Sequence, residues 1–376
     1  MLTCQHENFF LSADKHYLNC AFMSPLMRSV ELAGIEALRL ERDPSQITPS
    51  MFFEEVNHAR TLFAQLINGK SENVALIPAT SYGIATIAHN LSVGSGDNII
   101  LAHGQFPSNV YTWQRLSNET GATIRTVTSH GGEWTQKILE AITYRTAVVA
   151  IGTLHWANGS SFDLVEISQR AHDVGAYLIL DGTQSIGALP FDLQAIKPDA
   201  LVCAGYKWLL GPYGTAFLYM GESFIDGVPL EEGWLARDGS DNFGNLTNYT
   251  DRYRPGAARF DRGQTNSFAQ TAMMVKALKQ ILDWKPQQIQ AYCSSLIKDF
   301  LPAIRRRGYT IHDSCFSHLF GITLPEHVDQ THLSSELARQ QISVSMRGSG
   351  IRISPNVYNT GADIDALQDV FLSAAK

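Results

Sequence analysis

Short apolar runs alternate with amphipathic stretches between residues 50 and 220 of the chain. The apolar runs predict buried strands at 74–77, 98–102, 147–151, 177–181, 200–204 and 215–219. The amphipathic stretches predict helices at 50–68, 81–91 and 163–174, and Asp163 is the expected cap of the third helix. Strands that are apolar on both faces and alternate with helices are typical of a mainly parallel sheet sandwiched by helices. We therefore expect an α/β fold for this region.

Beyond Gly256 the pattern changes. Helical stretches at 268–284 and 286–307 precede short strands at 319–324, 343–346 and 351–354 and a closing helix at 363–374, an order typical of an α+β domain. We expect a large α/β domain at 21–256, a smaller C-terminal α+β domain at 257–376, and an N-terminal segment at 1–20 that packs on the small domain. Residues 221–256 show little periodicity, which predicts a long surface excursion.

The composition argues against several classes of function. The chain has 376 residues and a formal net charge of −7, so it lacks the broad positive charge with which proteins bind nucleic acids or anionic membranes. No apolar run approaches the roughly 20 residues that a bilayer requires, and the polar start does not resemble a signal peptide. We therefore expect a soluble cytoplasmic protein without nucleic-acid or membrane partners.

The cysteines and histidines predict neither disulfides nor a metal site. The 5 cysteines are scattered and form no CxxC pair, so we expect reduced thiols. The histidines show no HxxxH or HExxH spacing, which leaves ordinary polar or core histidines as the expectation.

Two charged residues follow neighbouring predicted strands. Asp181 ends the run 177–181, and Lys207 follows the run 200–204. Ligands bind beyond the carboxyl ends of strands in open α/β sheets, so both side chains should point into one crevice. A carboxylate there can hold the proton of a pyridinium ring, and a lysine with a lowered pKa can form an imine and move protons. These are the two roles that pyridoxal 5′-phosphate (PLP) chemistry needs; a loop-capping Asp and a solvated Lys are the alternative.

The sequence around this pair resembles a known family. The segments Tyr177–Ala188 and Ala204–Gly214, with local matches from about Tyr17 to the C-terminus, are similar to the class V aminotransferase family of fold-type I PLP enzymes. That family includes cysteine desulfurases, kynureninases and isopenicillin N epimerase. The resemblance implies PLP as the cofactor and Lys207 as its Schiff-base lysine. It also implies that Asp181 pairs with the pyridine nitrogen and that Gln184 contacts the phenolic oxygen of the ring.

The resemblance also implies a phosphate site. Residues 78–83 open a predicted helix, whose free N–H groups and dipole favour an anion. In the family this turn holds the PLP phosphate, which assigns Thr80 and Ser81 to it; a simple helix cap is the alternative. Tyr206 matches a phosphate ligand of the kynureninase-like members.

Four more residues surround the ring and the substrate by the same resemblance. Phe106 would stack on the cofactor ring, where cysteine desulfurases carry His; a core position is the alternative. Asn158 would hydrogen-bond the phenolic oxygen, or form a turn with the following glycine. Trp156 or His155 would face the substrate.

Two segments of the predicted C-terminal domain complete the expected site. Arg352 would bind the α-carboxylate of an amino-acid substrate, because a guanidinium grips a carboxylate through two parallel hydrogen bonds; a surface salt bridge is the alternative. Gln264 and Thr265 match positions that reach the phosphate of the neighbouring subunit's cofactor, which implies a homodimer with shared active sites. A polar turn before the next helix is the alternative there.

The resemblance leaves the reaction open. Cysteine desulfurases place a nucleophilic cysteine on a loop just before the carboxylate-binding arginine, and Met346–Ile351 contains none. A persulfide-forming desulfurase is therefore disfavoured. We expect a PLP-dependent aminotransferase or β-eliminating lyase that acts on an α-amino acid through an external aldimine, with Lys207 transferring the α-proton. The alternatives are an amino-acid epimerase of the same family and a non-catalytic binding or scaffold protein with the PLP fold.

Overall fold

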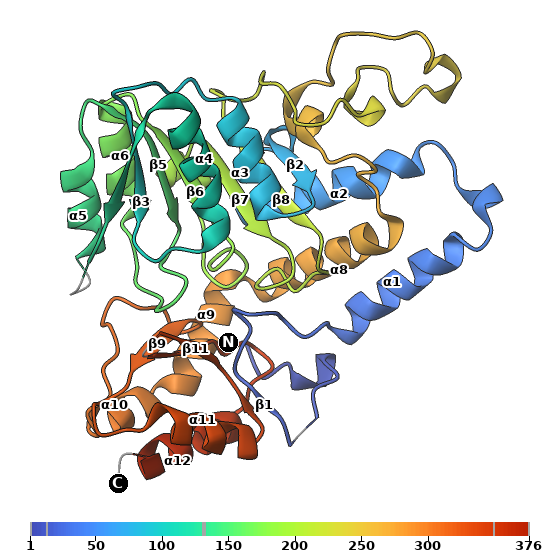
Figure 1. The fold of residues 1–376 in the computed structure, drawn as a ribbon. Coiled ribbons are helices and arrows are strands. Elements are labelled where there is room, and N and C mark those ends of the chain that lie inside the picture. The colour runs from blue at the N-terminus through green and yellow to red at the C-terminus, as the bar shows by residue number, and fades with distance from the viewer. Residues whose placement is uncertain (1, 13, 130–132, 349, 375–376) are drawn as a thin grey trace.

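The computed structural model describes residues 2–12, 14–129, 133–348 and 350–374. Its main feature is a seven-stranded sheet with the strand order β2-β8-β7-β6-β5-β3-β4 (Figure 1). The strands are β2 (Val74–Ile77), β3 (Asn98–Ala102), β4 (Thr123–Val127), β5 (Thr146–Gly152), β6 (Tyr177–Asp181), β7 (Ala200–Ala204) and β8 (Ala216–Met220). The pairs from β4 to β7 are parallel, and β8 runs antiparallel to both β7 and β2. The predicted mainly parallel sheet is thus confirmed.

Helices cover both faces of this sheet, as the doubly apolar strands require. They are α2 (Met51–Leu66), α3 (Thr80–His89), α4 (Tyr111–Thr120), α5 (Trp134–Ala141), α6 (Leu164–Asp173), α7 (Leu193–Ile196) and α8 (Phe268–Trp284). Helix α1 (Arg28–Leu40) packs against α8. Alternate strand residues pack into two cores. One core includes side chains of α2, α5, α6 and α8, and the other includes side chains of α3 and α4. The expected cap of α6 is present, since the Asp163 carboxylate accepts a hydrogen bond from Glu166 N.

The C-terminal part has its own core and a small antiparallel sheet of order β11-β12-β9. Its elements are α9 (Pro286–Ile297), α10 (Phe300–Arg305), β9 (Phe320–Thr323), α11 (Gln330–Arg339), β10 (Ile342–Ser343), β11 (Ser345–Arg347), β12 (Gly350–Ile353) and α12 (Gly361–Ala374). The N-terminal segment lies beside this part (Figure 1), where β1 (His16–Tyr17) pairs in parallel with β10. Helix α8, which follows the predicted domain boundary, packs against α1 and α2.

Several elements differ from the sequence predictions for physical reasons. The helix predicted at 286–307 is two helices, because Pro302 has no N–H to donate to the carbonyl of Lys298. The edge strand β4 is mostly exposed and offers no apolar run, so the pattern does not reveal it. None of the helices in the described ranges has the length and apolar character of a membrane span.

Candidate active site

The carboxyl edge of the large sheet gathers segments from six strands. Loops that follow β3, β5, β6 and β7 leave from this edge, because these strands are parallel. The turn from β2 into α3 reaches the same edge, and so does the segment that enters β8, because β8 is antiparallel to both neighbours. Residues distant in sequence therefore meet at one place, as the position of ligand sites in open α/β sheets predicts.

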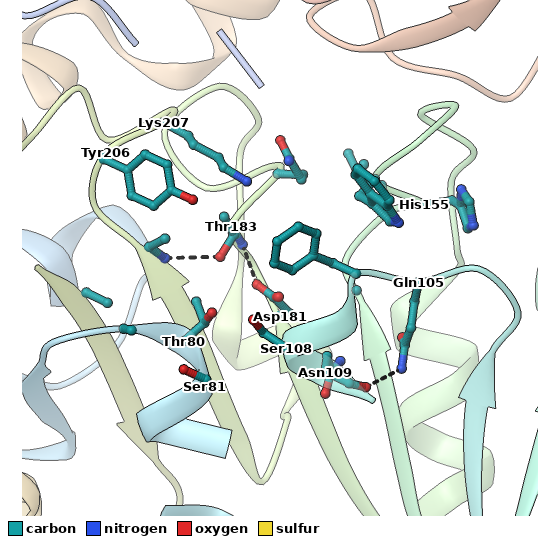
Figure 2. A pocket seen from close by; sticks show the side chains of 18 of the residues that line it. Thr80, Ser81, Gln105, Ser108, Asn109, His155, Asp181, Thr183, Tyr206 and Lys207 are labelled. Atoms are coloured by element: carbon teal, nitrogen blue, oxygen red, sulfur yellow. Dashed lines mark hydrogen bonds between the residues drawn. The ribbon is translucent and has the colours of Figure 1, made fainter. Parts of the chain in front are cut away.

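These segments enclose a cavity of about 230 Å³. It brings together most of the residues that the sequence predicts for the site: Thr80, Ser81, Phe106, His155, Trp156, Asp181, Gln184, Tyr206 and Lys207. Figure 2 shows the side chains of Lys207, Tyr206, Thr80 and Asp181 converging on the same space. Four predicted residues do not line this cavity, namely Asn158, Gln264, Thr265 and Arg352.

Lys207 follows β7 and is almost fully buried, with 5% of its surface exposed. Its Nζ lies 5.2 Å from the centre of the Phe106 ring and 5.4 Å from that of the Tyr206 ring. Burial lowers its pKa to about 8; Asp181 opposes this shift, whereas Arg352 and Arg347 add to it. An amine with this pKa is partly neutral near pH 8 and can act as a nucleophile or base.

Asp181 ends β6 beneath the cavity. Its Oδ1 accepts a hydrogen bond of 3.0 Å from Thr183 N, and the Thr183 hydroxyl accepts one of 3.0 Å from Ala204 N on the next strand (Figure 2). Burial raises the pKa of Asp181, while Thr183 and Lys207 lower it. A buried carboxylate held in this way is suited to pair with a cationic ring nitrogen.

The first turn of α3 faces the cavity with Thr80 and Ser81. The N-cap residue, Ala79, makes no side-chain cap. The first N–H groups of a helix have no partner within it, and with the helix dipole they favour an anion. Helix α3 lies close to the sheet because Gly83 has no side chain; a Cβ there would come within 2.6 Å of Val202 Cγ1.

The side chain of Gln184 is held between two partners. Its Nε2 donates to Ala21 O over 3.1 Å, and its Oε1 accepts from Trp208 Nε1 over 2.9 Å. One amide N–H is left for a ligand. On the other side of the cavity, Phe106 meets the Trp156 ring edge to face at 5.4 Å, and the Trp156 indole N–H donates to Gly104 O.

Arg352 lies just behind this wall and is 1% exposed. Its Nη1 donates to Trp156 O over 3.0 Å, whereas Nε and Nη2 are buried without a hydrogen-bond partner among the described residues. Burial and the neighbouring Arg347 lower its pKa, yet the guanidinium stays protonated at neutral pH. A buried cation with two unused donor groups is suited to an incoming anion.

Two predicted site residues that do not line the cavity, Asn158 and Thr265, have other partners. The Asn158 side chain accepts a hydrogen bond from Ser160 N, which is the turn alternative, and does not line the cavity. The Thr265 hydroxyl donates to Arg262 O, and Gln264 adopts a positive φ of 52°. Arg262 in turn donates to Gly214 O, which ties this segment to the cavity lining. His155, which does line the cavity, stacks on Trp134 at 5.2 Å.

Sequence reasoning missed several polar groups of the cavity wall: Gln105, Ser108, Asn109, Thr183 and Thr215. Gln105 Oε1, Asn109 Nδ2 and Thr215 Oγ1 are buried without a hydrogen-bond partner in the described part of the chain. The sequence could have indicated these residues, because they lie close to the ends of predicted strands and to residues that were already predicted for the site. Within the described ranges, no group of three or more His, Cys, Asp and Glu side chains could hold a metal ion.

The arrangement fits PLP. The start of α3 offers donors for a phosphate, Asp181 offers a buried carboxylate for a ring nitrogen, and Lys207 offers an amine with a lowered pKa. Phe106 supplies an aromatic face in the same cavity. These features define a PLP-dependent protein of fold type I.

Comparison with known proteins gives the family. The sequence profile of the family described as "Aminotransferase class-V" matches residues 45–367, so the chain belongs to the class V aminotransferase family and its cofactor is PLP. The predicted family, fold class and cofactor are thereby confirmed.

The similar proteins of this family include both an aminotransferase and a cysteine desulfurase by name. An uncharacterized aminotransferase, YcbU, of Bacillus subtilis is 23% identical over 82% of this chain and 80% of its own. A cysteine desulfurase of Enterobacter sp. is 30% identical, over 48% of this chain and 46% of its own.

Solved structures share the fold over nearly the whole chain. The cysteine desulfurase CsdA of Escherichia coli has a TM-score of 0.85 at 21% identity, covering 98% of this chain and 97% of that one. A mutant of C-DES with glycine covalently linked to its PLP cofactor has a TM-score of 0.88 at 18% identity, covering 98% and 99%. A complex of the cystine C-S lyase C-DES with its reaction product, cysteine persulfide, has a TM-score of 0.85 at 18% identity, covering 96% and 97%.

Proposed function

We propose that this chain is a PLP-dependent enzyme that acts on an α-amino acid, as an aminotransferase or a β-eliminating lyase. The observation that carries the proposal is the pair formed by Lys207 and Asp181 on adjacent strand ends of one cavity. Bound PLP supplies an electron sink for the charge that develops when a bond to the α-carbon breaks.

The residues divide the work around the cofactor. Lys207 would hold it, and its amine, whose lowered pKa suits proton transfer, would move the α-proton of the substrate. Asp181 keeps the ring nitrogen protonated. Thr80, Ser81 and Tyr206 bind the phosphate, and Phe106 packs on the ring face. Gln184 would donate to the phenolic oxygen, and Asn158 is proposed as a second donor to it.

The substrate lies on the side of Trp156 and His155. Arg352 binds its α-carboxylate through Nε and Nη2, the two groups that lack a partner in the described structure. Trp156 links this arginine to the cavity, because its carbonyl accepts from Nη1 while its ring lies against Phe106.

The thiols argue against a persulfide mechanism. No cysteine is among the described residues that line the cavity. Burial raises the pKa of Cys20 to about 12 and that of Cys315 to about 11, which disfavours the reactive thiolate. An amino-acid epimerase remains the alternative, because it needs the same removal of the α-proton.

A homodimer with shared active sites is part of the proposal. Large apolar side chains are exposed along α1 and just before it: Phe22, Met23, Leu26, Leu32, Ile35 and Leu38. An apolar face of this kind is typical of a protein interface. Gln264 and Thr265 would reach the partner's cofactor phosphate. We also assign the protein to the cytoplasm.

Purified protein incubated with PLP tests the cofactor role. We expect a visible absorbance band and, after borohydride, a mass increase that maps to Lys207. In Lys207→Ala the borohydride-stable adduct should disappear. A wild-type protein that takes up no PLP would leave only the scaffold alternative.

Product assays separate the reactions. Each amino acid is tested for keto acid, ammonia, sulfide and loss of optical activity in turn. Keto acid formed only with an added keto-acid acceptor identifies an aminotransferase, whereas keto acid with ammonia and no acceptor identifies a lyase. Loss of optical activity alone identifies the epimerase.

A further inference from the structure

Two arginines, not one, lie against Trp156. The Cζ atom of Arg347 is 5.0 Å from the centre of the Trp156 ring, and that of Arg352 is 5.5 Å from it. Trp156 lines the cavity and contacts Phe106, whose ring lies 5.2 Å from Lys207 Nζ. Neither arginine lines the cavity in the described structure, but both guanidinium groups lie against the side chain of Trp156, which does line it.

The hairpin of β11 and β12 fixes this arrangement. Ser345 pairs with Arg352, and Arg347 pairs with Gly350. Residues opposite each other in an antiparallel pair share a face, and so do residues two apart on one strand, so Arg347 and Arg352 are diagonal neighbours on the same face. Such neighbours are roughly 7 to 8 Å apart, a distance that long side chains can bridge through one small ligand.

Neither arginine has a carboxylate partner among the described residues. The ion pairs of the described structure involve other side chains. Arg347 donates from Nη1 to the carbonyl of Met346, and its Nε is buried without a partner within the described ranges. Arg347 also lowers the pKa of both Arg352 and Lys207, as a nearby positive charge must.

The proposed function leaves one of these charges unmatched. The cofactor phosphate lies at the start of α3, and the α-carboxylate of the substrate would occupy Arg352. Asp181 is the only carboxylate that lines the described cavity, and it is assigned to the ring nitrogen. Arg347, which lies against Trp156 at the edge of the cavity, is then left without an anion, and this is unfavourable for a partly buried cation.

We propose that Arg347 is a specificity-determining residue that binds a second anionic group of the substrate, so that the substrate is an acidic α-amino acid. This inference rests on the proposed function. Arg352 and Arg347 then grip two carboxylates separated by two or three carbon atoms, while the α-carbon faces Lys207.

Binding to the PLP-loaded protein tests the inference with matched ligands. Aspartate and asparagine, and glutamate and glutamine, differ in the charge of the side chain but hardly in shape. We expect the visible spectrum or circular dichroism of the cofactor to change at concentrations about tenfold or more lower for the acids than for the amides. Arg347→Gln should abolish this difference while the cofactor band is retained. Arg306→Gln, at an exposed position, is the matched control and should leave the difference intact.

The outcomes are separable. If the amides bind as tightly as the acids, or if Arg347→Gln weakens all four ligands equally, the acidic specificity is wrong while the proposed function stands. If no amino acid of a full set perturbs the cofactor spectrum, the proposed function itself is wrong. Arg352→Gln distinguishes the two arginines, because it should weaken acids and amides alike.

Discussion

The two ends of the cavity are built in different ways. The end that we assign to the cofactor is formed by strand ends and a helix start of one sheet: Thr80, Ser81, Asp181, Tyr206 and Lys207. The end that we assign to the substrate joins the loop after β5 to a hairpin nearly 200 residues later. Trp156 lines the cavity there, and Arg347 and Arg352 lie behind it.

Their charges differ as well. At the cofactor end, opposite charges stabilise each other: Lys207 lowers the pKa of Asp181, and Asp181 raises the pKa of Lys207, each against the effect of burial. At the substrate end, two guanidinium groups lie together without a carboxylate in the described structure. The charges of the cofactor end are thus balanced within the protein, whereas the positive charges of the substrate end require an anionic ligand. Variants of the first should change kcat, and variants of the second should change KM.

Asp181→Asn is expected to have the largest effect. The amide keeps the shape but cannot hold the proton of a ring nitrogen as a carboxylate does, so kcat should fall by about 10² to 10³-fold. The KM for the amino acid should change little. Steady-state kinetics of the PLP-loaded variant measure both, and Asp181→Glu is the charge-retaining control. A kcat within tenfold of wild type would show that Asp181 lacks this role.

Arg352→Gln should have the opposite signature. Loss of a charge-assisted hydrogen bond to a carboxylate costs roughly 1.5 to 3 kcal/mol, which corresponds to about a 10 to 150-fold weaker apparent affinity. Cofactor uptake should be unchanged, because the groups that we assign to the cofactor belong to other residues, which line the cavity. Titration of the cofactor spectrum with amino acid gives the affinity. If Arg352→Gln lost affinity for the cofactor and for the amino acid equally, the assignment of separate cofactor and substrate ends would be wrong.

The stability of the cofactor-free protein should depend on Lys207 above pH 8. In the folded chain its pKa is lowered to about 8 from the usual 10.5, so the unfolded chain holds more protons between these values. Stability relative to Lys207→Met should therefore rise as the pH increases from about 8 to 10.5, by roughly 2 to 3 kcal/mol. Urea unfolding at several pH values measures it. In Arg347→Gln and Arg352→Gln the rise should begin at higher pH, since both arginines lower the pKa of Lys207. A pH-independent difference contradicts the assignment.

The cofactor end could be predicted from the sequence, and much of the substrate end could not. Asp181 and Lys207 follow apolar runs, and parallel strands bring their carboxyl ends to one edge whatever the loops do. The role of Arg347 depends on the register of β11 and β12 and on the distant Trp156, which no local pattern contains. The sequence predicts that Ser345 and Arg352 belong to short strands, but it does not predict that these two residues pair with each other.

The same contrast explains the misses in the fold. The buried strands of the large sheet have a continuous apolar pattern, so their predicted bounds nearly match. The polar edge strand β4 and the exposed face of α1 carry no such signal. Thr183 lies two residues after Asp181 in the sequence. Its hydroxyl accepts a hydrogen bond from Ala204 N on the next strand, and this contact can be inferred only when the pairing of β6 and β7 is known.

Thr183 offers the finest test of the cofactor end. Its backbone N–H holds Asp181, its hydroxyl accepts from Ala204 N, and the hydroxyl helps to keep the pKa of Asp181 down. Thr183→Val keeps the shape but leaves the buried Ala204 N–H without its acceptor, which should cost about 1 to 3 kcal/mol of unfolding free energy. It should also raise the pKa of Asp181, so the acid limb of the kcat profile should move to higher pH.

Thr183→Ser is the control, because it retains the hydroxyl and should leave the acid limb in place. A structural role alone predicts that Thr183→Val loses stability without any movement of this limb. Such a result would limit Thr183 to joining the two strands. A shift in Thr183→Val that Thr183→Ser does not share assigns the hydroxyl a part in keeping Asp181 ionised, since the two variants differ in that group while both keep the backbone N–H.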